Sequence, residues 1–177
     1  MKAFTFQAPP NILFEAGASR KLAEIVAGYG VTRVLLVTDK GVRNAGLTKH
    51  AEKDLTDGGC ELTVFEDVEA DPPSHVIERA VALCRDKGIE LVASIGGGSA
   101  LDTAKLVAYL AKTPDRLDDI YGVGLAKGER LPLLLAPTTA GTGSEVTPIA
   151  IVTTPTDRKS TRLNSSHESV SRMPSSA

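Results

Sequence analysis

The chain has 177 residues, a formal net charge of −2 and 42% hydrophobic residues, which suits one globular domain with a substantial core. The near-neutral charge and the aromatic content of only 4% argue against a nucleic-acid partner, which would need a basic face. No apolar run approaches the ~20 residues that cross a membrane, and the first residues lack the apolar core of a signal peptide. Cys60 and Cys84 match no metal or redox spacing, so we expect buried free thiols and a cytoplasmic location.

The first third of the chain alternates strand-like and helix-like segments. Residues 5–6 and 12–14 are expected to pair as a short hairpin, and Ser19 is expected to cap a helix that runs to about Ala27. The continuous apolar run at 34–38 predicts a strand of a parallel sheet that is covered on both faces. A helix at about 47–57 and a strand at 62–65 follow.

The same alternation continues to residue 158. A helix is predicted from Ser74 to about Lys87, then a strand at 91–95, a glycine turn and another helix. Further buried strands are predicted at 133–136 and 149–152. Strands separated by helices of about 10–15 residues form right-handed β-α-β units. The sequence therefore predicts an α/β fold with a Rossmann-like parallel sheet flanked by helices, in a dinucleotide-binding domain over residues 1–158.

A run of three glycines follows the predicted strand at 91–95. Gly96-Gly97-Gly98-Ser99 leads directly into a helix start, where bare backbone N–H groups and the helix dipole favour a phosphate. A plain turn is the alternative, with Ser99 and Asp102 forming a capping box. The motif is neither the G-x-G-x-x-G fingerprint nor a Walker loop, because Leu101 replaces the third glycine and no Gly-Lys-Ser/Thr follows.

Two further features are predicted at the same edge of the sheet. The segment at 137–147, Pro-Thr-Thr-Ala-Gly-Thr-Gly-Ser-Glu-Val-Thr, mixes glycines with hydroxyl side chains that hydrogen-bond at close range. Asp39 follows the strand at 34–38, where a carboxylate can accept hydrogen bonds from a ribose diol. Each is weak alone, but loops at the carboxyl ends of parallel strands meet in one crevice, where ligands bind.

The segment from Gly96 to Lys105, with the segment at 137–147 about forty residues later, resembles the iron-containing (group III) alcohol dehydrogenase family. The resemblance covers roughly residues 4–158 and implies NAD binding. NADP is expected to bind less well, because its 2′-phosphate would meet the Asp39 carboxylate at short range. The resemblance implies that Asp39 binds the adenosine ribose and that the diphosphate lies on Gly97, Gly98 and Ser99, with Asp102 nearby. The remaining contacts that it implies are Thr138, Thr139 and Thr142 on the adenine or nicotinamide side and Ile151 packed on the cofactor. The family commonly has Asn-Pro where this chain has Asp71-Pro72.

The family holds Fe²⁺ in a second, all-helical domain, through an aspartate, a histidine four residues later and two more histidines. This chain has only His50, His75 and His167, and none lies four residues after an aspartate. We interpret His50 and His75 as surface residues near helix starts. The metal domain is therefore expected to be missing, with no metal ligands or catalytic residues in these 177 residues and no activity of this fragment alone.

The last 19 residues follow a different pattern. Serine is enriched in 159–177, at positions 160, 165, 166, 169, 171, 175 and 176, and neither helical nor strand periodicity continues there. The run from Ser160 to His167 resembles a translated vector or adapter sequence. We therefore expect a disordered tail of non-native origin.

Taken together, the sequence predicts the cofactor-binding half of a metal-dependent alcohol dehydrogenase. The complete enzyme would exchange hydride between a small alcohol or aldehyde and NAD, with the metal as Lewis acid, and would be a homo-oligomer without nucleic-acid or membrane partners. A maleylacetate reductase or a hydroxyacid–oxoacid transhydrogenase on the same fold is one alternative. A non-catalytic nucleotide-binding module is the other.

Overall fold

A six-stranded sheet forms the centre of the computed structural model, which describes residues 9–153, 158–163 and 168–171. The strand order is β1-β9-β6-β4-β2-β3, and every neighbouring pair is parallel. The strands are β1 (Ile12–Phe14), β2 (Arg33–Val37), β3 (Glu61–Phe65), β4 (Leu91–Gly96), β6 (Leu133–Pro137) and β9 (Glu168–Ser171). The predicted α/β fold is thus confirmed.

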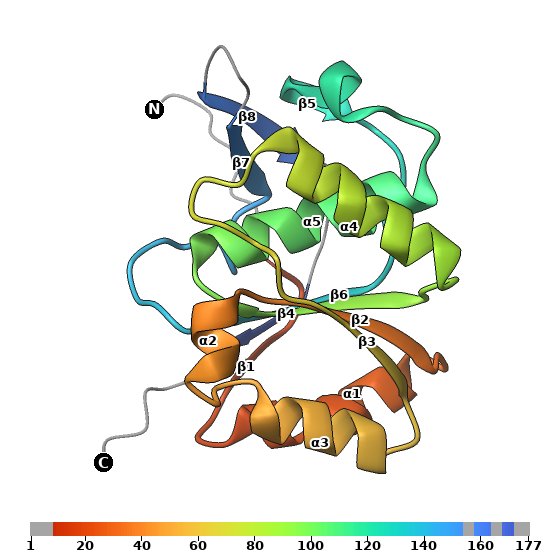
Figure 1. Ribbon diagram of the computed structural model, residues 1–177, viewed down its shortest axis with the longest axis vertical. Coiled ribbons are helices and arrows are strands. Elements are labelled where there is room, and N and C mark those ends of the chain that lie inside the picture. Colours follow the sequence, from red (N-terminus) through yellow and green to blue (C-terminus); the bar gives the residue numbers. More distant parts are fainter. Residues whose placement is uncertain (1–8, 154–157, 164–167, 172–177) are drawn as a thin grey trace, which may run out of the picture.

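Helices cover both faces of this sheet (Figure 1). Helices α1 (Leu22–Gly28) and α3 (Lys49–Asp57) lie on one face, and α4 (Ser74–Asp86) and α5 (Gly98–Lys112) on the other. Alternate residues of β2 enter the two cores: Val34 and Leu36 pack with α1 and α3, and Leu35 and Val37 with α4 and α5. All four side chains are fully buried, which explains the continuous apolar run. The short elements are α2 (Lys40–Asn44), η1 (Ala18–Arg20) and η2 (Leu117–Ile120).

A second, smaller sheet packs on the far side of α5 (Figure 1). It has the order β5-β8-β7, with β5 (Gly122–Ala126), β7 (Ile149–Thr153) and β8 (Arg158–Leu163), and β7 and β8 are antiparallel. Helix α5 contacts β4 and β6 of the large sheet and β7 of the small one. Its residues from Ala100 to Leu110 are consequently all buried, including Asp102 and Lys105.

Two of the predicted elements are placed differently in the structure. The strand at 149–152 belongs to the small sheet rather than the parallel one, and it exposes Ile149 and Ile151 on one face. Its apolar run identifies a strand but carries no information about its pairing partner. Ser19 does not cap a helix: Gly17, with φ 82°, begins the 3₁₀ turn η1, and α1 starts only after Lys21.

The N-terminal and C-terminal segments also depart from the predictions. Strand β1 pairs in parallel with β9, while the other half of the expected hairpin, residues 5–6, lies outside the described residues. Strands β8 and β9 fall in the segment where neither helix nor strand was expected. Strand pairing uses main-chain groups, so such strands need no side-chain periodicity. The non-native origin of this tail is a separate matter and stays a prediction.

Both cysteines are free thiols, but only one of the two is buried. Cys84 is buried and Cys60 half-buried, both as free thiols, and burial raises the pKa of the Cys84 thiol to about 12. A thiol in such surroundings is structural rather than reactive. Within the described residues, no helix has the length and apolarity to cross a membrane.

The packing of α1 on α3 leads to a stability prediction. A Cβ at Gly58 would lie 2.4 Å from Ala23 Cβ, whereas one at Gly28 would meet nothing within 4 Å. We expect Gly58→Ala to lower the free energy of unfolding by about 1–3 kcal/mol, as overpacking does, when measured by urea denaturation. Gly28→Ala is the matched control and should leave stability unchanged or slightly raised. Equal effects of the two substitutions would contradict this account of the α1–α3 contact.

Candidate functional site

The carboxyl ends of β2 and β4 mark the point where the sheet reverses its strand order. The two strands are neighbours, but β2 is followed by β3 on one side of the pair and β4 by β6 on the other. In open parallel sheets the crevice at this reversal is where ligands bind. Asp39 follows β2, the glycine turn follows β4, and the 137–147 segment follows β6.

The glycine turn presents bare backbone at the start of α5. Gly97 is the N-cap, with φ −78° and ψ −178°, and no side chain caps the helix. The capping-box alternative is therefore wrong: Ser99 Oγ accepts a hydrogen bond from the Asp71 amide at 3.3 Å instead. Because α5 runs for 15 residues, its dipole and its first N–H groups favour an anion at this end.

The second glycine-rich segment packs directly on this turn. The Thr138 amide donates to the Gly96 carbonyl at 2.9 Å. A Cβ on Gly97 would lie 3.6 Å from Thr139 Cγ2, and one on Gly98 would lie 3.4 Å from Thr142 Cγ2. The structure thus brings together the two motifs that the sequence singled out, with hydroxyl side chains of one facing bare backbone of the other.

Asp39 lies beside the same turn. Its Oδ1 caps α2 by accepting from the Val42 amide at 2.9 Å. Its Oδ2 lies on the side of the glycine turn, 3.7 Å from the place that a Cβ on Gly96 would take. A half-buried carboxylate with one oxygen fixed by a helix cap is well placed to hold a diol with the other.

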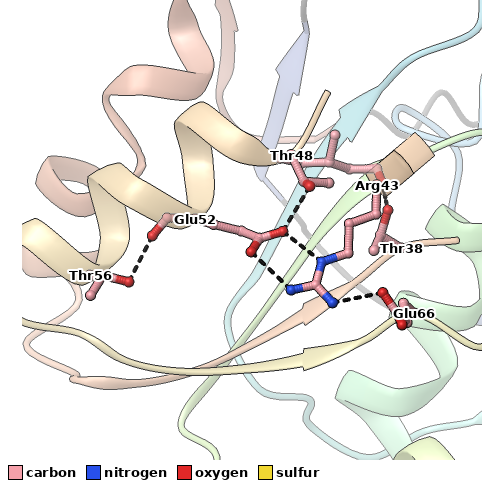
Figure 2. A network of polar contacts seen from close by, with 7 residues as sticks. Thr38, Arg43, Thr48, Glu52, Thr56 and Glu66 are labelled. Atoms are coloured by element: carbon pink, nitrogen blue, oxygen red, sulfur yellow. Dashed lines mark hydrogen bonds and ion pairs between the residues drawn. The ribbon is translucent and has the colours of Figure 1, made fainter. Parts of the chain in front are cut away.

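A network around Arg43 holds α2, and with it Asp39, in position (Figure 2). The Arg43 guanidinium donates to both carboxylate oxygens of Glu52 on α3, at 3.1 and 3.2 Å, and to Glu66 after β3 at 2.7 Å. Thr48 Oγ1 also donates to Glu52, at 2.8 Å. Burial alone would raise the Glu52 pKa, but the hydrogen bonds from Arg43 and Thr48 lower it below its ordinary value. The Arg43–Glu52 pair therefore stays charged at neutral pH.

Asp102 forms a buried ion pair with Lys105 that connects α5 to β7. Lys105 Nζ lies 3.0 Å from Asp102 Oδ1 and donates to the Ile149 carbonyl at 2.7 Å, while Asp102 Oδ2 accepts from the Ile151 amide at 3.1 Å. Both residues are almost completely buried. Burial lowers the pKa of Lys105, and the carboxylates of Asp102 and Glu145 oppose that shift.

This pair changes the interpretation of two predicted site residues. Asp102 was expected near the diphosphate, yet both of its oxygens accept hydrogen bonds from the protein. Ile151 leaves 37% of its surface exposed, while its amide is held by Asp102. Sequence reasoning did not single out Lys105. The available signal was an i, i+3 Asp–Lys pair inside a mostly apolar helix.

The described residues do not fit an iron site. No group of three or more His, Cys, Asp and Glu side chains comes together in the part of the chain that the structure describes. His50 lies 3.5 Å from Arg20, His75 is on α4, and His167 is outside the described residues. We therefore derive no step of a reaction through a metal held by these residues.

Comparison with known proteins now decides the family. The model of the family described as iron-containing alcohol dehydrogenase matches residues 9–172. The chain belongs to this family. The chain is 30% identical over 148 residues to an NAD-dependent methanol dehydrogenase of Bacillus methanolicus, which is 84% of this chain and 39% of that protein.

Solved structures of this family share the fold. A 1,3-propanediol oxidoreductase has a TM-score of 0.91 at 26% identity, over 97% of this chain and 46% of that one. The sulfoacetaldehyde reductase of Bifidobacterium kashiwanohense, solved in complex with NAD⁺, has a TM-score of 0.84 at 29% identity, again over 97% and 46%. The chain thus spans less than half the length of these relatives.

The buried pair yields a prediction for stability. Lys105→Met should lower the free energy of unfolding by roughly 3–5 kcal/mol, because it leaves the Asp102 carboxylate buried without its cation. The double variant Asp102→Asn/Lys105→Met removes both charges, so its free energy of unfolding should fall by less than that of Lys105→Met. Lys53→Met breaks an exposed i, i+4 pair with Asp57 and should cost at most about 0.5 kcal/mol. Chemical denaturation measures all three, and a Lys105 effect as small as that at Lys53 would argue against a stabilising role of the pair.

Proposed function

We propose that this chain is the NAD-binding part of a metal-dependent alcohol dehydrogenase, an oxidoreductase that exchanges hydride between a small alcohol or aldehyde and the nicotinamide. The observation that carries the proposal is the uncapped start of α5 at the strand reversal, faced by the hydroxyl-rich loop after β6. Family membership and the NAD named for two of the relatives support it.

The proposed cofactor contacts follow the order of the strands across the sheet. Asp39 would bind the adenosine ribose, and the backbone at Gly97 and Gly98 with Ser99 would hold the diphosphate. Thr138, Thr139 and Thr142 would contact the adenine or nicotinamide side. The exposed side chain of Ile151 would pack on the cofactor, while Asp102 acts nearby, through its hold on β7, rather than by touching the diphosphate.

The cofactor fits the residues present, whereas the metal does not. Side chains on Gly97 and Gly98 would fill the narrow space between the backbone of the turn and the side chains of Thr139 and Thr142. When bound, NAD supplies the hydride chemistry, and the residues described here bind and orient it. In the complete enzyme, iron would be held by residues other than those described here, and it would act as a Lewis acid.

Two further proposals concern the setting of the protein. The free thiols of Cys60 and Cys84 support a reducing compartment, and we place the protein in the cytoplasm on that ground. We also propose that the complete enzyme is a homo-oligomer without nucleic-acid or membrane partners.

The phosphate role is tested by calorimetric titration of the 177-residue chain with NAD⁺. Gly97→Val should lower the affinity about tenfold or more, since a side chain would fill the approach of the diphosphate to the backbone. Its φ of −78° is accessible to any residue, so the variant should remain folded. Gly96→Ala is the contrasting variant: its Cβ would lie 2.6 Å from Ala100 Cβ and should instead disturb the turn itself. Unchanged NAD⁺ affinity in folded Gly97→Val would mean that the turn is only structural.

The ribose role predicts a preference for NAD over NADP. A 2′-phosphate would meet the Asp39 carboxylate at short range, at a cost on the order of 1–3 kcal/mol, or about 5- to 150-fold in affinity. Asp39→Gly should reduce the difference between the affinities for NAD⁺ and NADP⁺. Asp39→Asn should reduce this difference as well, but an asparagine can still cap α2, so this variant isolates the effect of the charge. Equal affinity of the parent chain for both cofactors, measured by calorimetry, would remove Asp39 from this role.

A further inference from the structure

A cluster of charged side chains lies next to Asp39, where the chain leaves β3. A backbone bridge joins Asp67 to Asp39, and Lys40 directly follows Asp39 in the chain. The Asp67 carboxylate lies between two cations, with Oδ1 3.0 Å from Lys40 Nζ and Oδ2 2.6 Å from Arg79 Nη2. These three residues line a cavity of about 360 Å³ together with Glu66, Val68 and Glu69.

The two cations extend from α2 and α4, and their side chains are more than half exposed, 66% for Lys40 and 57% for Arg79. Arg79 extends from α4 and lies over the Phe65 ring, 5.9 Å from its centroid. Lys40 is the first residue of α2, the helix that the Arg43 network holds. Hydrogen bonds from Lys40 and Arg79 lower the pKa of Asp67, so its carboxylate is charged at neutral pH. The cavity thus contains two positioned cations whose charge is already partly balanced.

The chemistry of this cluster matches what a 2′-phosphate requires. In dinucleotide-binding sheets a cation near the ribose accommodates that phosphate, while an acidic residue selects the free 2′-hydroxyl. Here the acidic residue is Asp39, and both nearby cations are occupied by Asp67. A phosphate entering this cavity would have to displace Asp67 and would meet the carboxylates of Glu66 and Glu69 as well.

We propose that Asp67 is a second determinant of cofactor specificity, which selects NAD by occupying, as an internal carboxylate, the place of a 2′-phosphate between Lys40 and Arg79. This inference rests on the proposed function, because it requires the adenosine ribose to lie at Asp39. It goes beyond a simple repulsion by Asp39, because it assigns a latent phosphate subsite whose ligands are already in position.

The test is calorimetric titration of the full chain and of Asp67→Asn with NAD⁺ and NADP⁺. Releasing two partly exposed cations should raise NADP⁺ affinity about 5- to 10-fold and leave NAD⁺ affinity within about twofold. In the double variant Asp67→Asn/Arg79→Met the gain should be lost. Asp67 is partly exposed, so the thermal unfolding midpoint should change little, and Asp67→Ala provides a second variant of the same kind.

The matched control is Glu69→Gln, which removes the same charge from the same cavity without freeing Lys40 or Arg79. It should raise NADP⁺ affinity less than Asp67→Asn does. An equal rise in the two variants, or an unchanged NADP⁺/NAD⁺ ratio in Asp67→Asn, would overturn the inference while leaving NAD⁺ binding intact. Absence of NAD⁺ binding to the parent chain would overturn the proposed function, and this inference with it.

Discussion

The structure depends on one helix that is buried from both sides. Helix α5 lies between the parallel sheet and the small sheet (Figure 1), so the polar side chains in its middle, Asp102, Thr103 and Lys105, are buried away from water. Asp102 and Lys105 satisfy their hydrogen-bonding requirement because they hydrogen-bond to each other and to the main chain of β7. Buried charges persist only when they are paired and hydrogen-bonded in this way. The pair therefore fixes the position of α5 relative to strand β7 of the small sheet.

That arrangement also sets the geometry of the proposed cofactor site. The amino end of α5 is the glycine turn, the loop after β6 packs on that turn, and β7 is fixed through its Ile149 carbonyl and Ile151 amide. The proposed diphosphate end is thus anchored to the buried strands β4 and β6 and to the buried helix α5, although the turn and the loop themselves are partly exposed. The proposed adenosine end differs, because Asp39 lies on a short helix held by the half-exposed ion pairs of Arg43, beside the exposed ion pairs that Asp67 makes with Lys40 and Arg79. Interactions of that kind are weaker and are screened by salt, so specificity can change there without loss of the fold.

Sequence reasoning succeeded where local pattern and tertiary role coincide. The apolar runs of β2, β4 and β6 and the periodic helix α4 were predicted within a residue or two, because burial on both faces or on one face imposes those patterns directly. It failed where the local sequence pattern does not specify which strand or side chain a residue contacts. The apolar residues of β7 identify a strand but not its sheet, and the strands β8 and β9, which have no apolar periodicity, pair through their main chains. Asp102 followed glycines and resembled a cap or a ligand, but its partner is an interior lysine.

By itself, the sequence determined the alternation of strands and helices, the parallel sheet and the two glycine-rich segments at its carboxyl edge, since these depend on periodicity and on what glycine permits. Its motifs also indicated the family. Only the tertiary structure decided which polar groups face the crevice and which are occupied elsewhere. Asp39 and Asp102 are the same residue type, each beside a predicted ligand segment, yet one has an oxygen toward the glycine turn and the other is buried against Lys105. The difference lies in contacts between residues far apart in the chain, such as those of α5 with β7, which no local pattern encodes.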